Sequence, residues 1–173
     1  MSRLPIYTLC REQWVARPLP RVFPFFAQPE NLALITPPSL DFNLLTPSPV
    51  LMEQGRVIDY TIRVLGVRVR WRSLISTYQP PYCFVDEQLL GPYSFWHHTH
   101  RFAAEGTGTR LYDEVRYALP AWLPQPLADA LHRWHVQPTL RQIFDFRRQQ
   151  FQRLFGAPVA GAQAPAMDLA SQA

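Results

Sequence analysis

The sequence FVDEQLLGPYSFWHHTHRF, residues 84–102, predicts two β-strands joined by a tight turn at Gly91-Pro92. Side chains alternate between the two faces of a strand. On the second strand one face carries Trp96, His98, His100 and Phe102. On the first strand the residues that can face the same side are Phe84, Asp86, Gln88 and Leu90. This shared face is mostly aromatic and apolar but carries ionisable groups, which is typical of a ligand pocket.

More strands flank this hairpin on both sides. Residues 56–65 and 67–78 alternate in polarity around a turn at Gly66, and residues 110–119 alternate after a turn at 106–108. Two further stretches read as a first strand and a short strand, at residues 6–15 and 40–46. Short connections between successive strands indicate antiparallel hairpins.

Two regions predict helices instead. Residues 18–35 are rich in aromatic residues and interrupted by proline, which favours two short helices. Residues 124–155 place apolar side chains at helical spacing and predict one long helix, bent near Pro138. The final residues, 156–173, are small and polar and predict a disordered tail.

Together these elements predict an α+β domain over residues 1–155. Its fold is a curved antiparallel sheet of about seven strands wrapped around a long C-terminal helix, with two short helices after the first strand. An antiparallel sheet with one apolar face must have that face covered. The long helix is the large amphipathic element available, and we expect a cavity between it and the sheet.

Composition narrows the class of protein. A chain of 173 residues is most simply one domain, and no apolar run is long enough for a transmembrane segment. The N-terminal residues show no secretory signal pattern, so we expect a cytoplasmic protein. Cys10 and Cys83 are far apart in sequence and are expected to be small buried thiols.

The basic residues do not predict a nucleic-acid partner. All seventeen are arginines, and they are scattered along the chain. The exception is a row of arginines at 68, 70 and 72, which alternate on one strand face. Such a row could touch phosphates, but a solvated outer face of the sheet is the simpler interpretation.

The order of the elements and several motifs resemble the SRPBCC superfamily. This group of helix-grip proteins includes START lipid-transfer domains, the birch-pollen allergen family and polyketide cyclases/dehydrases, and the chain looks like a bacterial ligand-binding subgroup. The motifs are Ile35-Thr36-Pro37-Pro38, Gly55, Ile58-Asp59-Tyr60, Trp71, residues 84–88, Gly91-Pro92-Tyr93, Trp96-x-His98-x-His100-x-Phe102, Asp113-x-Val115-x-Tyr117-x-Leu119-Pro120 and residues 143–147. The resemblance implies a hydrophobic small-molecule cavity, without a catalytic residue or cofactor that can be carried over.

Hairpin geometry gives a more specific expectation for the polar residues. A turn centred on Gly91-Pro92 places Asp86 near His98, and a turn centred on Gly106-Thr107 places His100 near Asp113. Two histidine–carboxylate pairs would then lie side by side on the concave face. The predicted ligand-binding residues are Tyr60, Trp71, Phe84, Asp86, Gln88, Trp96, His98, His100, Phe102, Asp113 and Tyr117.

Three interpretations of this polar cluster remain open. It can be a satisfied buried network that fixes strand register, or the polar anchor of an apolar cavity. It can also do chemistry: a histidine of the cluster, His98 or His100, paired with Asp86 or Asp113, is a possible general base. Two such histidines with an aspartate could alternatively hold zinc. The other histidines, His97, His132 and His135, are expected to be surface or packing residues.

The leading hypothesis is a binding or carrier protein for a hydrophobic small molecule such as a lipid, a quinone or a polyketide-like compound. No metal, cofactor or nucleic acid is expected, and a homodimer is possible. The mouth of the cavity is predicted at the short helices of residues 18–35 and at loops 47–49 and 80–81. The alternatives are a polyketide cyclase or dehydratase, and a regulatory interaction module with a vestigial pocket.

Overall fold

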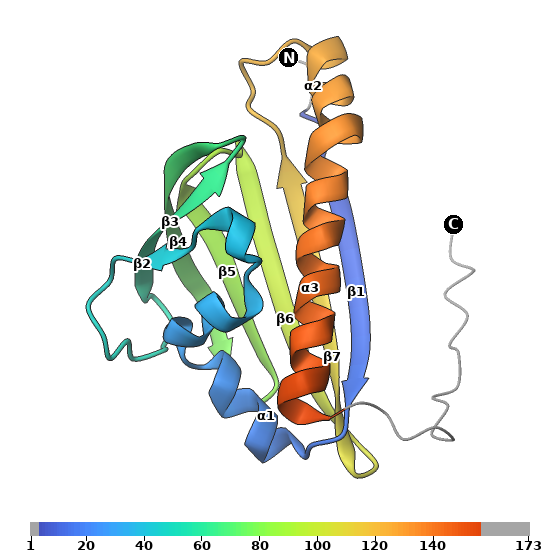
Figure 1. Ribbon diagram of the computed structural model, residues 1–173. Coiled ribbons are helices and arrows are strands. Elements are labelled where there is room, and N and C mark those ends of the chain that lie inside the picture. The colour runs from blue at the N-terminus through green and yellow to red at the C-terminus, as the bar shows by residue number, and fades with distance from the viewer. Residues whose placement is uncertain (1–3, 157–173) are drawn as a thin grey trace.

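The computed structural model describes residues 4–156, and in this range seven strands form one antiparallel sheet in the order β1-β7-β6-β5-β4-β3-β2 (Figure 1). The predicted disordered tail lies almost wholly outside the described residues. The strands are β1 Tyr7–Val15, β2 Asn43–Leu44, β3 Val57–Val64, β4 Val67–Gln79, β5 Cys83–Leu90, β6 Phe95–Glu105 and β7 Gly108–Ala118.

Helices cover one face of this curved sheet (Figure 1). The short helices after β1 are the α-helix α1 and the 3-10 helices η1 and η2, and the C-terminal region contains α2, the π-helical turn η3 and α3. Their bounds are α1 Leu19–Phe26, η1 Pro29–Ile35, η2 Pro38–Leu40, α2 Gln125–Leu131, η3 His132–Val136 and α3 Gln137–Phe155. This is the predicted helix-grip architecture, with a long C-terminal helix lying along the concave side of the sheet.

The long helix is continuous but changes its hydrogen bonding just before Pro138. The backbone N–H of Gln137 donates to the carbonyl oxygen of His132, five residues earlier. Proline has no N–H to donate and its ring clashes with the preceding turn of an α-helix. A wider π-turn before the proline relieves this clash, so the irregularity that the sequence predicted near Pro138 is found over residues 132–136.

The core consists of two apolar clusters at opposite ends of α3. Phe151 and Phe155 pack with α1 and the end of the sheet near Val15. Leu140 and Phe144 belong to the second cluster, which includes α2 and β7. The space between the two clusters, facing the middle of the sheet, is where the cavity lies.

Two expectations about local structure are wrong. The predicted strand over residues 40–46 is reduced to Asn43–Leu44, because Pro38 starts a 3-10 turn and Asp41 takes a left-handed backbone conformation with φ of 45°. The cysteines are free thiols, as expected, but Cys10 is exposed and Cys83 only half-buried.

None of the helices within residues 4–156 has the length and hydrophobicity needed to cross a membrane.

The arginine row on β4 lies on the outer, solvated side of the sheet, as predicted. Arg72 forms a bidentate pair with Asp59 of β3, at 2.9 and 3.0 Å. Arg70 lies 3.5 Å from the same carboxylate, and Arg68 pairs with Asp41. These arginines therefore have acidic partners within the chain.

Candidate functional site

A cavity of about 520 Å³ lies between α3, the concave face of the sheet and the short helices. Its walls are mostly apolar and aromatic, and the sheet, the C-terminal helix and the short helices all contribute to them. On the sheet side Trp71 packs edge-on against Trp96 with ring centroids 5.1 Å apart, and stacks on Tyr60 at 6.0 Å. On the helix side the wall includes Leu140 and Phe144.

Eight of the eleven predicted ligand-binding residues line this cavity. They are Tyr60, Trp71, Phe84, Asp86, Trp96, His98, His100 and Asp113. The other three do not. Phe102 packs against Phe23 in the apolar core, and Tyr117 hydrogen-bonds to His132 at 3.0 Å.

Gln88 is the third predicted residue that does not line the cavity, because its side chain is used by the β5–β6 turn. Its Nε2 donates to the carbonyl oxygen of Tyr93 at 2.6 Å, and its Oε1 accepts from the Tyr93 backbone N–H at 3.3 Å. Gln88 therefore closes the hairpin that carries the histidines, and its amide is occupied by the protein's own backbone.

Several lining residues were missed from the sequence. Arg147 is not among the predicted ligand-binding residues, but it lines the cavity and its guanidinium lies 5.1 Å from the ring centroid of Phe144. Tyr93, in the β5–β6 turn, also lines the cavity and packs on Trp96 at 5.0 Å. His135 of the π-turn lines it as well. The helical spacing of α3 gave the only signal for Arg147, since it lies three residues after the buried Phe144.

The mouth of the cavity is marked by the lining residues that are exposed. They are Gln28, Ser39, Arg63, Leu65, Gly66 and Gln142. The opening therefore lies between the α1–η1 connection, η2, the tip of the β3–β4 hairpin and the first half of α3. The short helices take part, as predicted, but loops 47–49 and 80–81 do not line the cavity, so that part of the prediction is wrong.

The strand register that the sequence predicted is confirmed at the polar residues. Asp86 of β5 is paired with His98 of β6, and His100 is paired with Asp113 of β7. One register shift in either hairpin would have turned these side chains to the outer face. His97, the neighbour of His98, faces the outer side and lies 3.8 Å from Glu87.

The four side chains form one closed ring rather than two separate pairs. We call Asp86, His98, His100 and Asp113 the His–Asp cluster. Asp86 Oδ2 lies 2.9 Å from His100 Nε2 and 3.4 Å from His98 Nδ1. Asp113 Oδ1 lies 3.0 Å from His98 Nε2 and 2.9 Å from His100 Nδ1. The two imidazoles lie next to each other with centroids 3.7 Å apart and planes inclined by 40°, and one carboxylate lies at each end of the pair.

Burial and mutual contact shift the pKa values of the cluster in different directions. Burial opposes ionisation of Asp113, but hydrogen bonds from His100 and His98 hold the pKa of this carboxyl well below its usual range. Burial also lowers the pKa of His100, yet its contacts with the two carboxylates prevail and raise it. For His98, burial and the nearby His100 lower the pKa below its ordinary value.

The opposite directions of these shifts make His100 the imidazole that holds a proton more strongly and His98 the one that holds it less strongly. Hydrogen bonds join His98 Nε2 to Asp113 at 3.0 Å and His100 Nε2 to Asp86 at 2.9 Å. The longest of the four nitrogen–oxygen contacts, 3.4 Å, joins His98 Nδ1 to Asp86. His98 Nδ1 is therefore the nitrogen that the carboxylates engage least.

Aromatic rings shield the cluster from water. Phe84 stacks on His100 with centroids 4.1 Å apart, and Phe144 of α3 meets His98 edge-on at 5.7 Å. The two histidines are 4% and 8% exposed. Low access to water strengthens the electrostatic interactions between these groups and whatever else occupies the cavity.

Comparison with known proteins supports the fold and leaves the function open. No protein-family profile and no curated protein matches the sequence. Among solved structures, an aromatase/cyclase named Zhui from Streptomyces sp. R1128 is similar, with a TM-score of 0.64 and 17% identity over 91% of this chain and 99% of that one.

Two further solved structures have the same architecture. A START superfamily protein from Mycobacterium smegmatis has a TM-score of 0.61 and 12% identity, covering 85% of this chain and 98% of that one. The major latex-like protein 151 of Panax ginseng has a TM-score of 0.61 and 9% identity, covering 87% and 97%. The chain therefore has the same helix-grip fold as these solved structures, as the sequence predicted.

Proposed function

We propose that this protein binds and carries a hydrophobic small molecule, such as a lipid, a quinone or a polyketide-like compound. The observation that carries the proposal is the cavity of about 520 Å³ with mostly apolar walls and a compact group of polar side chains in its lining. Sites for small molecules usually have volumes of about 300–1,000 Å³ and combine apolar walls with a few polar groups that fix orientation.

The cavity suggests how such a ligand would lie. Its apolar body would contact Trp71, Trp96 and Phe144, while a carbonyl or hydroxyl group would reach the His–Asp cluster. The solved structures named above support this proposal because the same fold occurs in a START superfamily protein and in an aromatase/cyclase. The free thiols of Cys10 and Cys83 are consistent with a reducing, cytoplasmic location. A homodimer stays a prediction.

Native mass spectrometry of the purified chain tests the proposal directly. We expect an adduct with the mass of one small molecule that organic extraction removes. The extracted protein should then bind one equivalent of the neutral fluorescent probe N-phenyl-1-naphthylamine. Ser73→Trp, which places a large ring in the cavity lining, should abolish probe binding.

A matched control is Ser76→Trp on the same strand, because Ser76 contacts Glu87 on the outer face and does not line the cavity. It should keep wild-type probe binding. If the folded wild-type protein shows neither a co-purified molecule nor saturable probe binding, the binding proposal is wrong and the interaction module with a vestigial pocket becomes the better hypothesis.

A second candidate function is an enzyme that moves a proton on a carbonyl compound. The geometry of His98 favours it, because Nδ1 makes the longest contact of the cluster, 3.4 Å from Asp86, and the ring lines the cavity beside two carboxylates. A histidine so placed can act as a general base for aldol cyclisation or dehydration. The fold likeness to an aromatase/cyclase is in keeping with this candidate.

A synthetic poly-β-ketone thioester is the probe for this second function. Wild-type protein should convert it to a cyclised or dehydrated product, detected by mass spectrometry. His98→Phe, which keeps an aromatic ring at this position, should lose at least about 100-fold in rate, whereas His97→Gln on the outer face should retain it. Equal rates for wild type and His98→Phe would exclude His98 as the base.

A further inference from the structure

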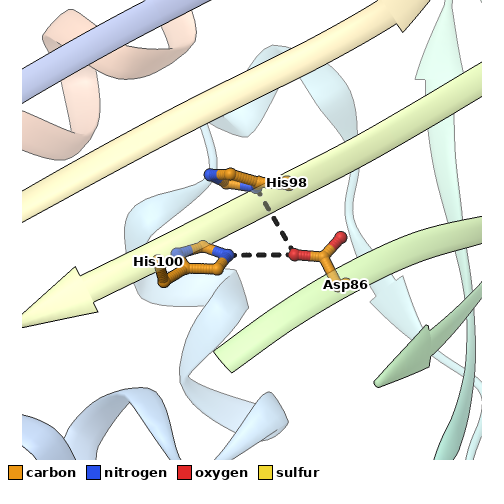
Figure 2. A group of neighbouring side chains, drawn as sticks. All are labelled: Asp86, His98 and His100. Atoms are coloured by element: carbon orange, nitrogen blue, oxygen red, sulfur yellow. Dashed lines mark hydrogen bonds and ion pairs between the residues drawn. The ribbon is translucent and has the colours of Figure 1, made fainter. Parts of the chain in front are cut away.

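Three potential metal-ligand atoms converge at one end of the His–Asp cluster. His98 Nδ1 and His100 Nε2 both approach the same oxygen, Asp86 Oδ2, and all three atoms lie within 4.8 Å of one another. Figure 2 shows the two imidazoles of β6 facing the Asp86 carboxylate across the β5–β6 pair. A tetrahedral zinc ion with bonds of about 2.0–2.1 Å needs its ligand atoms roughly 3.3 Å apart, and the nitrogen–oxygen distances of 2.9 and 3.4 Å bracket this value.

The opposite ends of both imidazoles are held by a single carboxylate. His98 Nε2 and His100 Nδ1 lie 3.0 and 2.9 Å from Asp113 Oδ1. Histidines that bind metals usually donate their other N–H to a carboxylate or a carbonyl, which fixes the tautomer and the ring orientation. In the tautomer that directs both N–H groups to Asp113, His98 Nδ1 and His100 Nε2 are the unprotonated nitrogens, and both lie on the Asp86 side.

That arrangement requires positive charge between the three atoms. Two nitrogen lone pairs and a carboxylate repel one another unless a proton or a cation lies between them. The other charged group that lines the cavity and acts on Asp86 is the guanidinium of Arg147. With neutral histidines, the two carboxylates and Arg147 sum to one negative charge, so a divalent cation is compatible with the surroundings.

We propose that Asp86, His98 and His100 bind one divalent transition-metal ion of the zinc class, and that Asp113 positions both histidines. Imidazole and carboxylate ligands suit this class of ion, and all four side chains line the cavity. Three protein ligands leave a coordination position for an oxygen atom from the cavity. The site departs from the sequence expectation of no metal, and it does not depend on the identity of any hydrophobic ligand.

The test uses the untagged full chain, stripped with a chelator and then titrated with Co²⁺ and Zn²⁺. We expect the visible absorption of Co²⁺ to saturate at one ion per chain, and Zn²⁺ to displace it. Zinc should also shift the proton resonances of the His98 and His100 rings in NMR spectra. These readouts need no substrate and no hydrophobic ligand, so they separate this proposal from the binding function.

Isosteric variants test the assigned roles. Asp113→Asn should weaken metal affinity by about 10–100-fold, as loss of a supporting carboxylate does, and Asp86→Asn should weaken it further. His97→Gln, on the outer face of the same strand, should bind as the wild type does. Near-ultraviolet circular dichroism checks that each variant is folded. The proposal is overturned if wild type shows no saturable site at one ion per chain, or if folded Asp86→Asn binds as tightly as wild type.

Discussion

Arg147 shows how a single side chain changes the chemistry of the cavity. Its guanidinium lies over the Phe144 ring, and its charge helps to hold the pKa of Asp86 down, together with the larger effects of the nearby histidines. An arginine in an apolar wall gives the interior of the cavity an anion-binding group close to the acidic residues of the sheet. The other arginine of the lining, Arg63 of β3, is exposed at the mouth and pairs with Asp41.

This placement predicts a charge-dependent effect on binding. Arg147→Met keeps a long side chain but removes the charge, so affinity for the anionic probe 1-anilinonaphthalene-8-sulfonate should fall by about tenfold, or roughly 1.4 kcal/mol. Affinity for the neutral N-phenyl-1-naphthylamine should change little. Fluorescence titration of both probes measures the difference.

The neighbouring residue is a matched control for Arg147. Arg148 is exposed and does not line the cavity, so Arg148→Met should leave both affinities unchanged. Equal losses for the two probes in Arg147→Met would show that the side chain acts by packing rather than by charge.

The sequence identified most of the sheet side of the site but not the helix side. Alternation along a strand assigns each side chain to one face, and this was sufficient for His98, His100 and Asp113. On a helix, a residue at the edge of the apolar stripe can face either solvent or a cavity. Arg147 occupies such an edge position, and its placement depends on tertiary packing that periodicity does not encode.

At the scale of the elements, the β5–β6 hairpin is locked by the contact between Gln88 and the Tyr93 backbone. A Cβ atom added at Gly91 would lie 2.4 Å from Gln88 Oε1. A side chain at position 91 would therefore force the Gln88 amide to shift from its place. This turn sets the register that brings Asp86 and His98 together.

The contact predicts that two substitutions will not be additive. Gly91→Ala should push the Gln88 amide away from Tyr93 and cost about 1–2 kcal/mol in the free energy of unfolding, the range for lost hydrogen bonds. In a Gln88→Ala background the same change should cost much less, because the obstructing side chain is gone. Urea denaturation of the two single variants and the double variant measures the coupling, and additive effects would contradict the contact.

On the outer face of the sheet, ion pairs between Asp59 of β3 and two arginines of β4 connect the two strands of the β3–β4 hairpin. Hydrogen bonds from Arg72 are the main cause that lowers the pKa of Asp59, and Arg70 adds to it against the opposing effect of burial. An aspartate with a depressed folded-state pKa contributes stability above its unfolded pKa of about 4, and this contribution is lost as the pH falls through the folded value.

Asp59→Asn should therefore destabilise the protein at pH 7 and have less effect in acid. We expect a loss of about 0.5–1 kcal/mol in the free energy of unfolding at pH 7, the scale for partly exposed ion pairs, and a smaller one at about pH 3.5. Urea denaturation at the two pH values tests this. A loss that is larger in acid would have the wrong sign for a depressed carboxyl pKa.

The strands and hairpins were predicted correctly where the sequence has clear turn residues. Glycine-containing turns fixed the hairpins that align Asp86, His98, His100 and Asp113. Phe102 was assigned to the cavity because it shares the strand face of His100, but the face is longer than the cavity. The α1 residue Phe23 fills the end of that face and contacts Phe102, and no sequence pattern indicates where the packing of another element stops.

For the whole molecule, the position of the mouth determines how a ligand reaches the cavity. The exposed lining residue on the long helix is Gln142, which lies across the opening from the β3–β4 hairpin. Its side chain contributes little to the core, because the residue is exposed. A larger side chain at this position would narrow the opening without disturbing the two apolar clusters.

Gln142→Trp should therefore slow probe uptake and release while leaving stability nearly unchanged, within about 0.5 kcal/mol as for exposed sites. Stopped-flow fluorescence with N-phenyl-1-naphthylamine measures both rates. Gln149→Trp, two turns further along α3 and outside the cavity lining, is the control and should keep wild-type rates. Unchanged rates in Gln142→Trp would place the opening elsewhere.

The shortness of β2 affects how easily the edge of the sheet beside the cavity mouth can open. The strand β2 pairs with the outer edge of β3 at Asn43–Thr61 and Leu44–Tyr60, and Leu45 and Thr46 extend this contact by donating to the carbonyl oxygen of Asp59. Among the described residues, no strand pairs with this edge beyond Thr61. Local fraying of this edge can therefore widen the mouth of the cavity, while the long hydrogen-bond ladders between β4 and β7 remain closed. Amide deuterium uptake should be faster at Thr61 and Arg63 than on the histidine-bearing strand β6, because this edge can open without exposing the buried imidazoles to bulk solvent.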